Sequence, residues 1–188
     1  MHRSLQAPQQ LHEAAQRVDA ALSCGELCAP MGGRSVQVGG EAFVFPYRAY
    51  YSRFQIGSLT QRLTGDDAVL AVCLVSRHHD GRVREAAIRD PQFLERPWTI
   101  PFAVQLLGEY VVEVGQAVED RISSFGLEPF VAFARENQQF METTRQRAVT
   151  YWDCYYRDVY RNLEEYPCFR AINAISTASQ RRLTTRSS

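Results

Sequence analysis

The sequence contains no lysine. All 21 of its basic side chains are arginine, and 21 aspartate and glutamate side chains balance them. Lysine supplies the amine of P-loop nucleotide sites, protein kinases and Schiff-base enzymes, so these chemistries are excluded. The formal net charge of zero gives no basic excess of the kind that nucleic acid or an anionic membrane attracts. Exclusive use of arginine is typical of a GC-rich genome, and we therefore expect a bacterial source.

A long apolar run is also missing. The longest run, residues 68–75, is far shorter than the ~20 residues that a membrane-spanning helix requires. Residues 1–17 are polar and lack the apolar core of a secretory signal. The five cysteines are odd in number, and Cys24 and Cys28 lack the two-residue spacing typical of zinc ligands. We therefore expect reduced thiols, no metal or cofactor, and a cytoplasmic protein outside the membrane.

The 188 residues fit one domain, and apolar residues recur at helical spacing along most of the chain. This pattern predicts a mainly α fold, either a helical bundle or an array of α-α hairpins, with a long C-terminal helix. We expect a single helical domain over 8–176 between flexible tails at 1–7 and 177–188.

One β-hairpin is expected, with strands 35–38 and 41–45 on either side of Gly39 and Gly40, which tolerate the positive φ of a tight turn. The next segment, 46–56, predicts a short helix or irregular chain. Thr64 is a candidate N-cap, with Asp67 three residues later in a weak capping box. The remaining helices are expected at 8–27, 64–79, 81–89 and 100–122.

Residues 129–166 contain no glycine between them and only Pro129 at their start, and their apolar residues keep helical spacing. The segment predicts one long helix, or two with an unmarked bend. In the single-helix form it would be a rigid rod that projects from the domain or braces it.

Asp80, Val83, Arg84 and Ala87 together resemble the turn and second-helix start of a HEAT-type repeat. The resemblance covers about 25 residues, and the hairpin and the long helix depart from the family pattern. It implies that Asp80 caps the second helix, that Val83 and Ala87 pack inward, and that Arg84 contacts a neighbouring repeat. No second copy of the motif is present in the sequence.

The same stretch supports a different hypothesis, a small helical enzyme or metal protein. His78, His79 and Asp80, facing Glu109 or Glu113 across a helix pair, could bind a divalent metal or serve as acid and base. Adjacent residues on a helix diverge by about 100°, so only one of the two histidines could point at a given centre. A position at a helix C-terminus is a structural alternative for the pair, because cationic side chains are favoured there.

Aromatic and arginine side chains are concentrated in residues 151–161. On a helix, these rings would span more than one face, so a single core contact could not bury them all. Such rings either pack between layers of the domain or form an interface, since tyrosine, tryptophan and arginine are the residues enriched at binding hot spots. The candidate interface residues are Tyr151, Trp152, Tyr155, Tyr156, Tyr160, Arg157 and Arg161.

The sequence therefore favours a non-catalytic helical module that binds a protein partner or a second copy of itself as a homodimer. The helical enzyme or metal protein is the alternative. Binding of single-stranded nucleic acid through stacked rings and arginines is a third possibility, and Asp153 and Asp158 among the arginines argue against it.

Overall fold

The computed structural model describes residues 7–22, 31–52, 56–57 and 63–184. The chain divides into two compact units, Met1–Thr99 and Ile100–Ser188, and each is described by itself. Both units are mainly helical, and one two-stranded antiparallel sheet is present in the described part of the chain. The predicted mainly α fold with a small hairpin is confirmed. No helix of this described part combines the length and apolar composition needed to cross a membrane.

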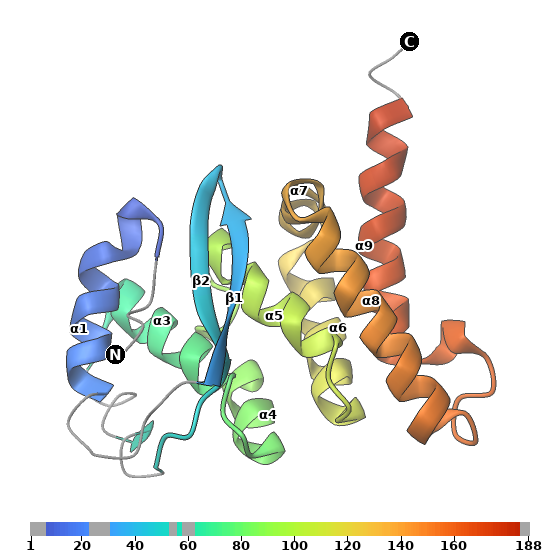
Figure 1. Cartoon of the computed structure of the whole chain (residues 1–188), viewed down its shortest axis with the longest axis horizontal. Helices are drawn as coiled ribbons and strands as arrows, with labels where there is room; N and C mark the ends of the chain where they lie inside the picture. The colour runs from blue at the N-terminus through green and yellow to red at the C-terminus, as the bar shows by residue number, and fades with distance from the viewer. Residues whose placement is uncertain (1–6, 23–30, 53–55, 58–62, 185–188) are drawn as a thin grey trace. The chain divides into compact units, whose positions relative to one another are not determined.

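The first unit contains helices and the hairpin. The described elements of this unit are η1 (Gln9–Leu11), α1 (His12–Leu22), β1 (Met31–Val38), β2 (Glu41–Arg48), α3 (Gly65–Val75), α4 (Gly81–Arg89) and η2 (Pro97–Thr99). Helices α1 and α3 pack against each other (Figure 1). The ion pair from Arg17 to Asp67, 2.7 Å between Nε and Oδ2, links these two helices at the surface.

The hairpin has the predicted turn, with Gly39 at φ 61° and Gly40 at φ 82°. Its strands are longer than expected, because β2 continues through Pro46 to Arg48, where a short helix or irregular chain was predicted. Val36 and Phe43 pair across the strands and are buried. The hairpin therefore has one apolar face that is buried.

Helix α3 ends at Val75, four residues before the predicted end at His79. The chain instead forms a turn in which His78 makes an isolated parallel bridge with Ala49. The Ala49 N–H donates to the Arg77 carbonyl, and the His79 N–H donates to the Ala49 carbonyl. Thr64 occupies the N-cap position, but its side chain makes no capping hydrogen bond, so the predicted capping box does not form.

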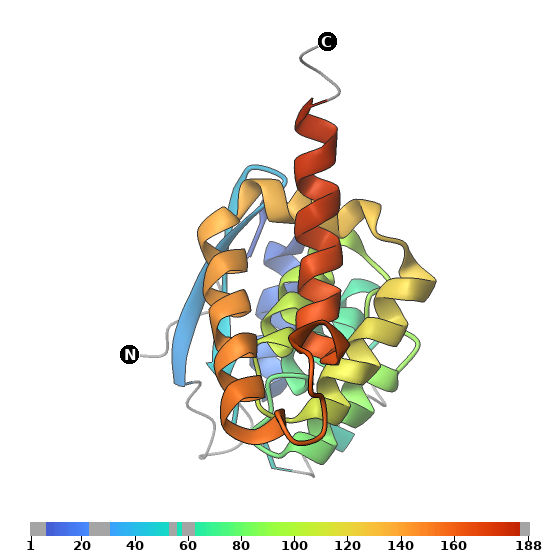
Figure 2. The same cartoon turned by 90° about the vertical axis from the view of Figure 1, so that its right-hand side faces the viewer.

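The elements of the second unit that the structure describes are all helices or helical turns. Helix α9 packs against α6, α7 and α8, and Figure 2 shows it between α8 on one side and α6 on the other. The elements are α5 (Ile100–Leu107), α6 (Val112–Phe125), α7 (Glu128–Glu136), α8 (Gln138–Tyr151), a π-helical turn (Trp152–Tyr156), η4 (Leu163–Glu165) and α9 (Pro167–Thr184).

The predicted helix over 100–122 is two helices, with a break between Leu107 and Val112. Gly108 lies against α8 so closely that a Cβ there would be 3.1 Å from Cγ2 of Thr144. Gln105 and Glu109, before and within this break, are both almost fully buried, whereas Glu113 and Asp120 of α6 are exposed.

The segment 129–166 is not a single rod. Asn137 lies at φ −130° and ψ 45° between α7 and α8, and its side-chain amide donates to the Phe133 carbonyl, 2.9 Å away. That carbonyl is the acceptor that the next helical N–H would otherwise use, so the helix stops there. Of the two predicted forms, the two-helix form is correct as far as Tyr151, and residues 157–162 are not helical.

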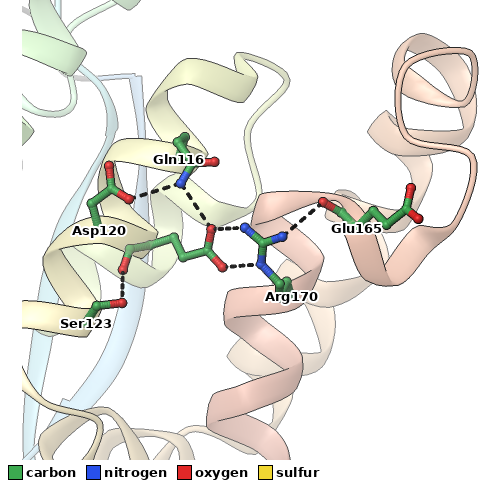
Figure 3. Close-up of polar contacts among 6 residues, drawn as sticks. Gln116, Asp120, Ser123, Glu165 and Arg170 are labelled. Atoms are coloured by element: carbon green, nitrogen blue, oxygen red, sulfur yellow. Dashed lines mark hydrogen bonds and ion pairs between the residues drawn. The ribbon is translucent and has the colours of Figure 1, made fainter.

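Helix α9 continues to Thr184, through part of the stretch predicted to be a flexible tail. Buried Ile172 and Ile175 hold it within the unit, and Arg135 of α7 donates to the Ser179 carbonyl near its end. On the other side, the Arg170 guanidinium forms a bidentate pair with Glu119 of α6, at 2.5 and 2.6 Å. Figure 3 shows this pair beside Gln116 and Asp120.

Candidate functional site

The chain reverses direction between α8 and α9 in a segment that we call the aromatic turn, residues 151–161 (Figure 1, orange). Its first part is the π-helical turn Trp152–Tyr156, a rare form that is often found at functional sites. The Trp152 indole N–H donates to the Tyr160 carbonyl at 2.8 Å, and the Tyr160 N–H donates to the Tyr156 carbonyl at 2.8 Å. These two hydrogen bonds fix the backbone of the turn, although residues 157–162 are not helical.

The inner side of the aromatic turn packs on the second unit. The Tyr156 ring stacks on Tyr166, with ring centroids 5.4 Å apart and an interplanar angle of 24°, and Tyr160 meets Tyr166 edge-on at 5.6 Å. Burial raises the pKa of both Tyr156 and Tyr166, so both phenols stay protonated. Tyr156 and Tyr160 are therefore chiefly structural, although the sequence placed both in the candidate interface.

The outer side of the aromatic turn is exposed. Tyr155 is 67% exposed and Val159 is 69% exposed. Tyr155 stacks on Tyr151 with centroids 6.3 Å apart, and Tyr151 in turn contacts Tyr110, whose ring is 51% exposed. Tyr110 comes from the break between α5 and α6, so the exposed aromatic surface joins residues distant in sequence.

The charges on the aromatic turn are balanced. Arg157 pairs with Asp153 at 2.8 Å and lies over the Trp152 ring, 5.3 Å from its centroid. Asp158 and Arg161 are both exposed, and neither forms an ion pair with another described residue. Among the described residues, the aromatic turn thus has one exposed charge of each sign outside an ion pair.

The HEAT-like stretch lies in the first unit and has a structural role. The Asp80 side chain accepts from the Arg82 N–H at 2.9 Å and caps α4, as the resemblance implies. Ala87 is buried, but Val83 is only half-buried. Arg84 is fully buried and donates to the carbonyls of His78 and His79, which precede its own helix, so these bonds are local and not the inter-repeat contact that the resemblance implies.

The two histidines of this turn are held in different ways. His78 is buried; its Nε2 donates to the Tyr51 carbonyl at 2.8 Å, and its Nδ1 accepts from the Asp80 N–H at 3.1 Å. These partners fix the neutral Nε2–H tautomer, and desolvation lowers the pKa of His78. The His79 ring is exposed, stacks on Tyr50, and lies 4.2 Å from the His78 ring. The rings meet because the turn is not helical.

The residues of the predicted metal or acid–base cluster are divided between the two units. Glu109 and Glu113 belong to the second unit, where Glu109 is buried at the α5–α6 break and Glu113 is exposed on the first turn of α6. Within the residues that the structure describes, no three His, Cys, Asp or Glu side chains lie close enough to hold a metal ion. Cys24 and Cys28 lie outside the described residues.

The second unit also has a trough lined by residues of α7, α8 and α9, with a volume of about 580 Å³, which was not predicted from the sequence. Met141 and Ala134 form its floor and polar side chains its rim. Its arginines are already engaged: Arg145 pairs with Glu142 at 3.6 Å, and Arg135 donates to the Ser179 carbonyl. The exposed rings of the aromatic turn are thus the stronger candidate for a binding site.

Comparisons with protein-family models, with curated proteins and with solved structures gave no match for the chain. The HEAT-type resemblance therefore stays a prediction, and the function has to be inferred from the geometry.

Proposed function

We propose that the chain is a non-catalytic protein-binding module of the bacterial cytoplasm and that the outer side of its aromatic turn is the docking surface. The observation that carries the proposal is the exposure of Tyr155 and Val159, 67% and 69%, on a backbone that is fixed by hydrogen bonds. Large exposed apolar side chains that lie together are typical of interaction sites.

The aromatic turn has the physical properties of a binding hot spot. Tyr155 and Tyr151 offer large ring surfaces with few rotatable bonds, so little side-chain entropy is lost when a partner covers them. The inner stack of Tyr156 on Tyr166 holds the turn in place before binding. A partner therefore meets a preorganised surface and does not have to order it.

Protein is a better partner than nucleic acid for this surface. Asp153 and Asp158 balance Arg157 and Arg161 within residues 153–161, so the surface lacks the excess of positive charge that phosphate groups require. Free Cys73, Cys154 and Cys168 suit a reducing compartment, in agreement with the proposed cytoplasmic location.

Site-specific photo-crosslinking in cells tests the proposal. A photoreactive phenylalanine replaces Tyr155 in one variant and Gln139, an exposed residue of α8, in a matched control. We expect one reproducible adduct at position 155, identified by mass spectrometry, and none at position 139. The identified partner, once purified, should bind the wild type at least 10-fold more tightly than Val159→Ser. Equal adducts at both positions, or no adduct at 155, would contradict the proposal.

A further inference from the structure

We propose that the partner of the aromatic turn is a second copy of this chain, docked around a two-fold axis that passes beside Tyr155 and Val159. This inference rests on the proposed function and names the occupant of the same surface. In such a dimer the same patch of both copies is buried, so the patch has to be its own complement.

The free charges of the turn satisfy that requirement. Asp158 and Arg161 are three residues apart, are exposed, and form no ion pair with other described residues. A two-fold axis between them places Asp158 of one copy opposite Arg161 of the other, and it does so twice. A patch with one free charge of each sign matches itself, whereas a partner with a surface of one sign would face repulsion from one of the two residues.

The apolar part of the patch also suits self-association. Tyr155 and Val159 are four residues apart in sequence and are the most exposed large apolar side chains of the described chain. Against a second copy, each Tyr155 ring can stack on its equivalent across the axis. The chain has a formal net charge of zero, so no long-range repulsion opposes the approach of two copies. The patch is small, and we therefore expect a Kd of about micromolar magnitude.

Charge reversal with complementation tests the inference by analytical ultracentrifugation at about 1 to 200 μM protein. Asp158→Arg places two positive residues on the patch and Arg161→Asp places two negative residues there, so each variant alone should dimerise at least 10-fold more weakly than the wild type. Their equimolar mixture should form a heterodimer, because positive then faces negative at both positions. The double variant D158R/R161D should dimerise as the wild type does. Arg82→Asp, an exposed charge reversal in α4, should change nothing.

Three outcomes would overturn the inference. The first is a wild type that stays monomeric up to 200 μM. The second is a dimer that the single charge reversals do not weaken. The third is two weakened single variants that do not associate when mixed, given unchanged circular dichroism. The proposed function is judged separately, because an adduct of Tyr155 with a different protein in cells would support protein binding by this surface even when one of these three outcomes has overturned self-association.

Discussion

The side-chain hydroxyl of Tyr156 donates a 2.6 Å hydrogen bond to the backbone carbonyl of Tyr110, 46 residues earlier in the chain. The same hydroxyl accepts from the Val112 N–H at 3.3 Å. Val112 is the first residue of α6, and the preceding Val111 has no side chain that can cap a helix. Tyr156 thus caps α6 from a distant segment, and it joins the aromatic turn to the α5–α6 break.

Removing this hydroxyl should destabilise the protein without removing the ring. We expect Tyr156→Phe to lower the free energy of unfolding by about 1 to 2 kcal/mol, because the variant leaves the Tyr110 carbonyl and the Val112 N–H without their partner. Urea denaturation measures the change. Tyr155→Phe is the matched control, because the Tyr155 side chain is largely exposed. The free energy of unfolding of this variant should differ from that of the wild type by less than about 0.5 kcal/mol.

Gly115 of α6 should not tolerate a side chain. A Cβ at this position would overlap the buried Sγ of Cys168 in α9, so Gly115→Ala should destabilise by about 1 to 3 kcal/mol through overpacking. Because Cys168→Ala removes the sulfur, the double variant G115A/C168A should recover part of the loss. Thermal denaturation of the four proteins measures this, and purely additive effects would show that the two residues do not collide.

The bidentate pair of Arg170 with Glu119 should contribute a modest coupling energy. The Arg170 side chain is half exposed, so solvent screening limits the pair to about 1 kcal/mol or less. A double-mutant cycle with Arg170→Gln and Glu119→Gln measures the coupling, which should fall in 1 M NaCl. Arg170→Lys should not restore it, since an ammonium group cannot make both bonds. A coupling that salt leaves unchanged would argue against this account.

The first unit should lose stability in acid through His78. Its folded pKa lies below the ordinary value of 6.5 because burial penalises the charged ring. The unfolded chain therefore binds the proton more readily, and the stability that the neutral ring contributes is present above pH 6.5 and is lost as the pH falls through and below that value. Chemical denaturation between pH 5 and 8 should show a smaller pH slope for His78→Gln than for the wild type. Equal pH slopes in the two proteins would contradict this account.

Local signals predicted the elements that local interactions stabilise. Gly39 and Gly40 between β-branched and aromatic residues predicted the hairpin, and the helix expected at 81–89 is α4 as found. The predicted end of α3 was wrong because the Arg77 carbonyl and the His79 N–H both bond to Ala49, which precedes the helix and gives no signal within it.

The helix breaks of the second unit depend on contacts between distant residues. At the α5–α6 break, Gly108 lies against Thr144 and Tyr156 caps Val112. Thr144 and Tyr156 both lie outside residues 100–122, so the sequence of that segment alone does not predict the break. The aromatic residues of 151–160 were identified as a candidate interface, but Tyr110 and Tyr166 were not. The spacing of apolar residues within one segment does not show which ring from another segment of the chain stacks on it.

The hairpin tip offers a practical position for an insertion. A Cβ at Gly39 or Gly40 would meet nothing within 4 Å, and lengthening a surface loop costs little free energy because closure entropy grows slowly with loop length. An epitope or affinity tag placed between these two glycines would leave both chain ends and residues 151–161 unmodified. Two differently tagged copies of the same protein could then be mixed and recovered separately, which would show directly whether one copy carries the other with it.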